Sequence, residues 1–202
     1  MSYDDKCQLL IIGDSFVGKT SLLGRYTKDI FNSSYLATIG LENFTKDEII
    51  NGKTVRIKIW DTAGQEKFQS LTKSFFRNAE GIMIVFDVTN SETYDHIIYW
   101  TQSIKIYVDS EIENIPVIII GNKIDSNKRE INKQEAQKYS QELGYPYFET
   151  SAKTGENVNK TIDYLVNQVL KRNSIIRSRR ANDENGNNNV KLNKQKEENC
   201  HC

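Results

Sequence analysis

The residues best suited to chemistry lie at positions 13–20, which read Gly-Asp-Ser-Phe-Val-Gly-Lys-Thr after four apolar residues. Gly13 and Gly18 allow the backbone to curl until successive N–H groups point inward at a phosphate chain. Lys19 would bring a positive charge to the β- and γ-phosphates, and the Thr20 hydroxyl is a hard oxygen ligand for Mg²⁺. The pattern predicts a nucleotide phosphate site formed by Gly13, Asp14, Ser15, Phe16, Val17, Gly18, Lys19, Thr20 and Ser21.

A second polar cluster indicates which base is bound. A mostly apolar run at 115–121 ends in Asn122-Lys123-Ile124-Asp125. The Asp125 carboxylate can accept hydrogen bonds from guanine N1–H and the exocyclic amine, whereas adenine offers no such pair of donors. Asn122 can brace the loop, the Lys123 stem can lie over the base, and backbone N–H groups of Ser151-Ala152-Lys153 could reach guanine O6. Each cluster follows a strand pattern, so all should meet at the carboxyl edge of one sheet, where open α/β sheets bind ligands.

A third cluster would respond to the γ-phosphate. A half-buried strand pattern is followed by Asp61-Thr62-Ala63-Gly64-Gln65. Asp61 can hold Mg²⁺ through water, the Gly64 N–H can bond a γ-phosphate oxygen, and Gln65 can orient an attacking water. Upstream, Thr38 can offer a second hydroxyl to Mg²⁺. The predicted metal-binding residues are therefore Thr20, Thr38 and Asp61.

Two other functions share parts of this pattern. A P-loop ATPase or kinase would bind phosphates in the same way, but Asp125 and the segment 151–153 favour guanine. A non-hydrolysing module that only holds GTP is disfavoured by the presence of Thr38 and Gln65. His96 has no partner at metal-ligand spacing and is expected to pack. The sequence therefore predicts hydrolysis of GTP to GDP and phosphate, with Lys19 and Gln65 as the catalytic residues.

The order of elements fits an open α/β sheet. Strand patterns near 7–12, 43–50, 54–60, 82–88, 116–121 and 146–149 alternate with helical patterns near 19–27, 67–77, 92–109, 132–143 and 156–172. Asn51-Gly52 predicts a tight hairpin, so the second and third strands should be antiparallel. The other strands should be parallel through right-handed crossovers. The prediction is an α/β P-loop GTPase domain with a six-stranded, mostly parallel sheet, one antiparallel strand and helices on both faces.

Composition sets only broad limits. The 202 residues suit one domain of ordinary size plus a tail, and 38% are hydrophobic. The formal net charge is +0, so nothing suggests nucleic-acid binding. The chain has no apolar run of membrane-spanning length and no cleavable signal, so it is not expected to span a membrane or enter the secretory lumen. Cys7 is expected to be a core residue in a reducing compartment.

Along residues 6–172 the chain resembles the small GTPases of the Ras superfamily and, within them, the Rab branch. Segments typical of Rabs are Arg56-Ile57-Lys58-Ile59-Trp60, Lys67-Phe68-Gln69-Ser70-Leu71-Thr72, Phe75-Phe76-Arg77-Asn78-Ala79 and Ile84-Val85-Phe86-Asp87-Val88-Thr89. The resemblance implies that Phe31 stacks edge-on against guanine. It implies a monomer that works with an exchange factor, a GTPase-activating protein, a lipid-masking carrier and GTP-state effectors.

The resemblance also implies an effector surface, formed by Ile39, Gly40, Leu41, Asn43, Trp60 and Phe75. Rabs usually carry an aromatic ring where this chain has Asn43. The neighbouring Phe44 cannot replace that ring, because adjacent strand residues face opposite sides of a sheet. This difference should leave nucleotide binding and hydrolysis unaffected, but it should change which effectors bind.

Residues 173–202 have a different composition. They contain no aromatic residue and include an asparagine-rich run at 182–189, so they cannot bury enough apolar surface to offset the entropy of ordering. The prediction is a folded domain at 1–172 followed by a disordered tether. The tether ends in Cys200-His201-Cys202, which resembles the ending on which Rabs receive two geranylgeranyl groups, and two lipids give stable anchoring. This implies a location on the cytoplasmic face of intracellular membranes, with a cytosolic pool.

Overall fold

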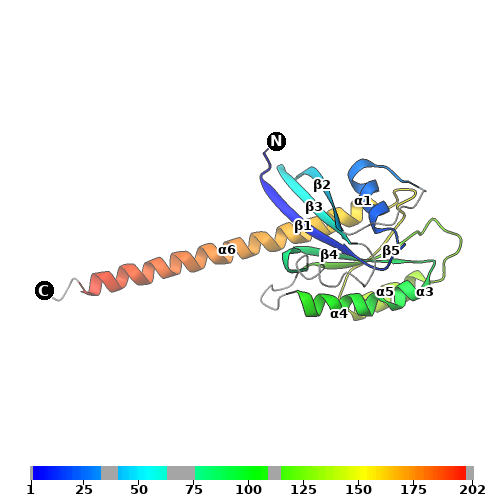
Figure 1. Cartoon of the computed structure of the whole chain (residues 1–202). Helices are drawn as coiled ribbons and strands as arrows, with labels where there is room; N and C mark the ends of the chain where they lie inside the picture. Colours follow the sequence, from blue (N-terminus) through cyan, green and yellow to red (C-terminus); the bar gives the residue numbers. More distant parts are fainter. Residues whose placement is uncertain (1, 33–40, 63–75, 109–114, 199–202) are drawn as a thin grey trace.

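A six-stranded sheet forms the centre of the protein in a computed structural model, which describes residues 2–32, 41–62, 76–108 and 115–198 (Figure 1). The strands are β1 (Asp5–Ile12), β2 (Leu41–Ile50), β3 (Lys53–Thr62), β4 (Gly81–Asp87), β5 (Val117–Asn122) and β6 (Tyr147–Thr150). Their spatial order is β2-β3-β1-β4-β5-β6. Only β2 runs antiparallel to its neighbour, and the turn at Asn51 and Gly52 has positive φ angles of 52° and 76°. The predicted fold class is confirmed.

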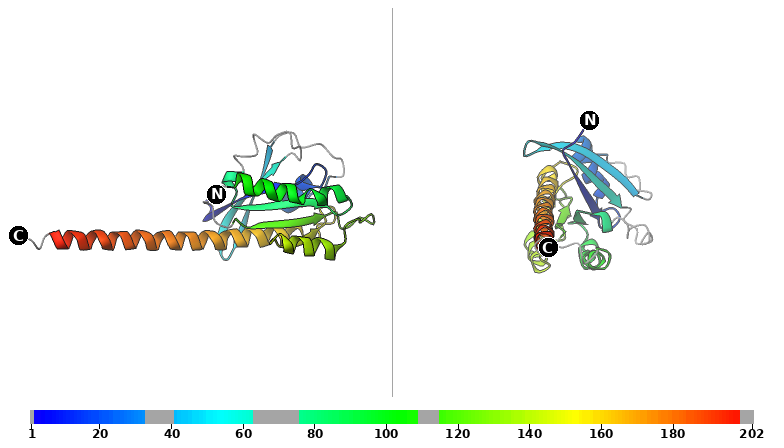
Figure 2. Two further views of the ribbon diagram at one scale, coloured as in Figure 1. Left: turned by 90° about the horizontal axis from the view of Figure 1, so that it is seen from below. Right: turned by 90° about the vertical axis from the view of Figure 1, so that its left-hand side faces the viewer.

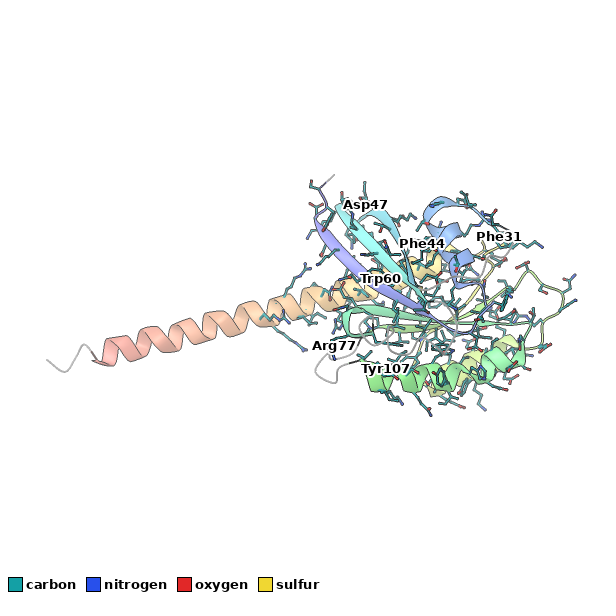
Figure 3. The ribbon with its side chains drawn as sticks, in the orientation of Figure 1. Phe31, Phe44, Asp47, Trp60, Arg77 and Tyr107 are labelled. Carbon is teal, nitrogen blue, oxygen red and sulfur yellow. The ribbon has the colours of Figure 1, made fainter. Side chains whose placement is uncertain are left out.

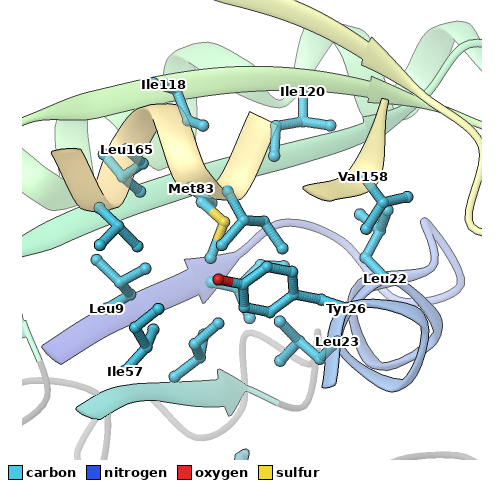
Figure 4. Packing of buried hydrophobic residues seen from close by; sticks show 14 of the residues in the cluster. Leu9, Leu22, Leu23, Tyr26, Ile57, Met83, Ile118, Ile120, Val158 and Leu165 are labelled. Atoms are coloured by element: carbon cyan, nitrogen blue, oxygen red, sulfur yellow. The ribbon is translucent and has the colours of Figure 1, made fainter. Parts of the chain in front are cut away.

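The helices cover both faces of this sheet. They are α1 (Lys19–Lys28), α3 (Ser91–Asp95), α4 (Ile97–Tyr107), α5 (Lys133–Glu142) and α6 (Val158–Glu198). Strand alternation directs Leu9 and Ile11 of β1 towards α1 and α6, in the cluster drawn in Figure 4. Leu10 and Ile12 face the opposite way and join a second cluster with residues of α3, α4 and α5. Both faces of the sheet are therefore shielded from water, as the nearly continuous apolar runs of the parallel strands require.

One predicted helix differs from the structure, and another lies largely outside the described residues. The single helix expected near 92–109 is divided into α3 and α4 at His96, whose backbone has φ −74° and ψ −5°. A hydrogen bond from the side chain of Asn90 to the Glu92 N–H caps the first of the two. The helix expected near 67–77 lies largely outside the described residues, and 76–78 are helical.

The last helix continues beyond the predicted end near 172, and the structure draws α6 as far as Glu198. The chain has no proline after Pro146, so nothing forces the helix to stop. Two contacts hold its first extra turns to the domain. Asn173 donates to Glu80 at 2.9 Å, and Arg177 forms a bidentate pair with Asp5 at 2.8 and 3.0 Å. Beyond these contacts α6 projects away from the sheet (Figure 2).

None of the helices within the described part of the chain has the length and apolar character needed to cross a membrane.

Candidate nucleotide-binding site

The loop between β1 and α1 has the curled backbone that phosphate binding needs. Gly13 and Gly18 have φ angles of 138° and 97°, which side-chain-bearing residues rarely adopt. A Cβ on Gly13 would lie 2.1 Å from the Val85 carbonyl oxygen, and one on Gly18 would lie 2.5 Å from Nδ2 of Asn122. Both glycines are therefore needed for close packing of the loop as well as for its conformation.

Replacing Gly13 by Ala is expected to destabilise the protein strongly, because the Val85 backbone cannot move aside without breaking the sheet. We expect a loss of at least about 3 kcal/mol, which lowers Tm by roughly 6–12 °C in a domain of this size. Thermal unfolding measures this directly. Gly144→Ala is the matched control, since Gly144 also has positive φ (79°) but has nothing within 4 Å of its added Cβ. Equal losses in the two variants would contradict the packing argument.

The Lys19 ammonium group lies inside the loop. Its Nζ donates to the carbonyl oxygens of Gly13 and Asp14 at 2.8 and 2.7 Å, and the residue is only 5% exposed. Burial lowers the pKa of Lys19 to about 8, and the charges of Asp61 and Asp14 oppose that shift. A buried cation inside this curled loop is well placed to meet an anion.

Thr20, the residue after Lys19, contacts Asp61 near the end of β3. The Thr20 hydroxyl donates to Asp61 Oδ2 at 2.5 Å, and the other carboxylate oxygen, Oδ1, has no hydrogen-bond partner among the described residues. Asp61 is fully buried, and burial raises its pKa to about 6. A buried carboxylate with an unpartnered oxygen beside a hydroxyl fits a hard divalent cation that is also bound by phosphate oxygens.

Two side chains from the region of α3 and α4 hold Asp14, and the sequence does not reveal either contact. Its Oδ1 accepts from Trp100 Nε1 at 2.8 Å, and its Oδ2 lies 2.5 Å from His96 Nδ1. The sequence predicts packing for His96, and the structure adds this polar contact at the junction of α3 and α4. The phosphate loop is therefore fixed to the helices on one face of the sheet as well as to β1.

Asn122, at the end of β5, joins the phosphate loop to the base loop. Its Nδ2 donates to the Val17 carbonyl at 2.9 Å. Its Oδ1 accepts from the Ala152 N–H and from the Thr150 hydroxyl, both at 3.2 Å. The amide is buried, so each of these bonds is shielded from water. Asn122 therefore links the phosphate loop to the start of the segment 151–153, whose backbone N–H groups are the predicted donors to guanine O6.

Asp125 and Lys123 lie on the loop that follows. Asp125 Oδ1 accepts from the Ser151 hydroxyl at 2.6 Å, and its Oδ2 lies 3.7 Å from Lys153 Nζ. Lys123 has φ 69°, and its Nζ pairs with the nearly buried carboxylate of Asp87 at 2.6 Å. Of the predicted phosphate, base and cation residues, the structure thus brings those within its described part to the carboxyl ends of β1, β3, β5 and β6.

The chain is similar to known proteins over almost its whole length. A family model described as "Ras family" matches residues 8–171. Human Ras-related protein Rab-8B is 38% identical over 185 residues, which cover 91% of this chain and 86% of that protein. Bovine Rab-13 is 39% identical over 84% of this chain and 82% of its own length, and rat Rab-15 is 41% identical over 83% and 78%. The chain belongs to the Rab branch of the Ras family.

This Rab GTPase is consequently a guanine-nucleotide switch that binds and hydrolyses GTP in vesicle trafficking. Its phosphate loop carries one exposed aromatic residue. Phe16 has φ 67° and is 64% exposed, an unusual conformation for an aromatic side chain. Phe31, labelled in Figure 3, is half-buried against the core cluster that contains α1 and α6.

The predicted effector surface of the Rab GTPase lies partly within the described residues. Asn43 pairs with Trp60 across β2 and β3, and Asn43 is exposed. Phe44 pairs with Ile59 and packs into the opposite cluster, which supports the expectation that it cannot replace a ring at 43 (Figure 3). Other predicted residues lie outside the described residues: Thr38, Ile39, Gly40, Ala63, Gly64, Gln65, Phe75, Cys200 and Cys202. Of Leu41, only its place at the start of β2 is described.

Proposed function

We propose that Lys19, the loop N–H groups, Thr20 and Asp61 hold GTP together with Mg²⁺ in this Rab GTPase. The observation that carries the proposal is the buried, unpartnered Oδ1 of Asp61 beside the Thr20 hydroxyl. Bound Mg²⁺ would supply positive charge to the phosphate oxygens and would offset the cost of burying the carboxylate. Thr38 is the further ligand that we propose for the GTP state.

In the proposed reaction, the protein contributes position and charge rather than covalent chemistry. Lys19 stabilises negative charge that develops on the β- and γ-phosphate oxygens, and its burial strengthens that interaction. Gln65 orients the attacking water. A GTPase-activating protein adds charge from outside, and such activators raise rates by about 10³–10⁵-fold. The site on its own should therefore act as a slow timer.

The switch follows from contacts that exist only with a γ-phosphate. Loss of that phosphate releases Thr38 and Gly64, and effectors that read the adjoining surface then dissociate. We place this surface over Ile39, Gly40, Leu41, Asn43, Trp60 and Phe75. The exposed amide of Asn43 opposite Trp60 supports an effector interface that is more polar at this point than an aromatic pair would be.

We also propose that residues beyond the contacts of Arg177 act as a tether rather than as part of the domain. Cys200 and Cys202 would carry two geranylgeranyl groups, which hold the protein on the cytoplasmic face of an intracellular membrane. A lipid-masking carrier would maintain the cytosolic pool, and an exchange factor would reload GTP. The asparagine-rich composition of 182–189 supports a tether, because such a segment has little apolar surface with which to pack.

Replacing Thr20 by Asn tests the cation site. The variant loses the hydroxyl ligand, so GTP affinity should fall at least about tenfold relative to GDP affinity, because the γ-phosphate depends more on the cation. Competition of GTP and GDP against a fluorescent GDP derivative, with and without Mg²⁺, measures the ratio. Thr20→Ser keeps the hydroxyl and is the matched control. An unchanged GTP/GDP ratio in Thr20→Asn would exclude this role, and preference of the wild type for ADP over GDP would exclude the guanine site.

A further inference from the structure

One buried hydroxyl lies between two carboxylates on the face of the sheet that α1 and α6 cover. The Tyr26 oxygen lies 3.1 Å from Glu48 Oε2 and 3.1 Å from Asp163 Oδ1. Tyr26 belongs to α1, Glu48 to β2 and Asp163 to α6, so the three side chains join three elements. Tyr26 is only 3% exposed and packs in the cluster drawn in Figure 4, whereas the two carboxylates are half-buried. None of the three residues belongs to the proposed nucleotide site.

Both contacts cannot be hydrogen bonds if both carboxylates are charged. Burial raises the pKa of the Tyr26 hydroxyl, so it keeps its single proton and donates to one carboxylate at a time. An ionised carboxylate has no proton to give, so the second one would face the phenol oxygen with lone pairs on both sides. One additional proton removes this conflict, because a protonated carboxyl can donate to the phenol oxygen while the hydroxyl donates to the other carboxylate. The geometry therefore favours a state in which one of the two carboxyls is protonated.

Asp163 is the carboxyl that is better suited to hold this proton. The charge of Glu48 is compensated by Lys46, whose Nζ lies 3.3 Å from Glu48 Oε2 and 4.1 Å from the centre of the Tyr26 ring. The ion pairs among the described residues include none with Asp163. Burial raises the pKa of Asp163 and the charge of Glu48 adds to that shift, while the hydrogen bond with Tyr26 and the charge of Lys46 oppose it. The titratable and charged groups that face Asp163 are thus Tyr26 from α1 and Glu48 and Lys46 from β2.

Glu48 connects this cluster to an edge of the sheet. β2 is the outermost strand, with β3 as its neighbour, so side-chain contacts with α1 and α6 add to its attachment. The same strand carries Asn43 of the proposed effector surface. A proton on Asp163 completes two hydrogen bonds that run from α6 through α1 to β2. Loss of that proton leaves two like charges around one hydroxyl.

We propose that Tyr26, Glu48 and Asp163 form a proton-dependent clamp that holds the edge strand β2 to α1 and α6. The clamp is closed when Asp163 carries a proton and is weakened when that proton leaves. An acid whose pKa is raised in the folded protein binds its proton more tightly there than in the unfolded chain, so its contribution to stability is present at low pH and is lost as pH rises through the folded pKa. The opposite sign holds for Asp47, because its hydrogen bond with Arg56 lowers its pKa.

The test compares the full-length wild type with Asp163→Asn, both loaded with GDP and Mg²⁺, by urea unfolding between about pH 5 and pH 8. The Asn amide can donate to the phenol oxygen at every pH, as a protonated carboxyl does. Asp163→Asn should therefore be more stable than the wild type at the alkaline end, and the difference should grow as pH rises through the pKa of Asp163. Asp47→Asn is the matched control on β2 and should show no gain at any pH in this range, because it loses a carboxylate that Arg56 stabilises.

Hydrogen exchange tests the attachment of β2 itself. At the alkaline end, β2 amides should exchange about two- to tenfold more slowly in Asp163→Asn than in the wild type, the range that one hydrogen bond of ordinary strength gives. Amides of β6, the edge strand on the other side of the sheet, open without involving the clamp and should exchange at the same rate in both proteins.

A titration of the wild type needs no variant, so it decides the question even if Asp163→Asn does not fold. The ¹³C shift of the Asp163 carboxyl should report a pKa above the value of about 3.9 that is ordinary for aspartate. A pKa at or below that value, or an Asp163→Asn protein that is no more stable than the wild type at any pH, would overturn the proposal. A gain in stability without slower exchange in β2 would also overturn it, because the cluster would then not hold that strand.

Discussion

Asp125→Asn is expected to change the nucleotide preference of this Rab GTPase from guanine to xanthine. The carboxylate lies at the end of β5, with Oδ1 held by the Ser151 hydroxyl at 2.6 Å. The hydrogen bond from the guanine amine would be lost, because two donors would face each other, and the bond from N1–H would lose its charge assistance; at about 1.5–3 kcal/mol for each charge-assisted bond, GTP affinity should fall roughly 10²–10⁴-fold. Xanthine carries an oxygen where guanine has the amine, and the new Asn side chain can donate to that oxygen while it accepts from N1–H.

Competition of GTP and XTP against a fluorescent nucleotide would measure this change. Asp47→Asn is the matched control, since Asp47 is also a carboxylate with a close partner, Arg56 at 2.7 Å, but lies on β2 far from the base loop. The control should keep the wild-type preference. If Asp125→Asn also keeps its preference for GTP over XTP, the base must be read by another residue.

The double variant Cys200→Ser, Cys202→Ser is expected to leave the protein in the cytosol. Each geranylgeranyl chain has about 20 carbons, and burial of each methylene contributes about 0.8 kcal/mol as an upper guide. Loss of both chains therefore removes the whole proposed anchor, whereas loss of one leaves reversible binding. GTP affinity should not change, because every described contact of the nucleotide site comes from residues before 158.

Cell fractionation and mass spectrometry of the C-terminal peptide would check both statements. His201→Ser keeps the two thiols at the same spacing and should remain on membranes. Each single cysteine variant should keep at most one lipid and show weaker or misdirected attachment. Recovery of the double variant in the membrane fraction would show that a protein receptor, rather than lipid, retains the chain.

Much of the fold was predictable because its signals are local in sequence. The apolar runs of β1 and β5, the Asn51-Gly52 turn and the glycines of the phosphate loop each occupy a few neighbouring residues, and their spacing reports backbone geometry directly. The end of α6 was not predictable in this way. No proline after 172 prevents helix continuation, and Asn173 and Arg177 contact Glu80 and Asp5, which lie more than ninety residues away in sequence.

Only those residues of the site that belong to a short sequence motif could be predicted. Nothing in the sequence around His96 and Trp100 points to Asp14, because the contacts join segments separated by more than eighty residues. From the sequence, Arg25 is likewise an ordinary residue of an amphipathic helix, and only the structure shows its contacts with the base loop. Side chains that support a motif from a distance leave no periodic signal in the sequence.

The length of the projecting part of α6 bears on the distance between the domain and a membrane. From Arg177 to Glu198 a helix rising about 1.5 Å per residue spans roughly 30 Å. At physiological ionic strength the Debye length is about 8 Å. Anchored through the proposed lipids, a domain held at that distance would lie several screening lengths from a charged leaflet, so the lipid would not orient its surface charges. In that arrangement, protein partners rather than the membrane would set the orientation of the proposed effector surface.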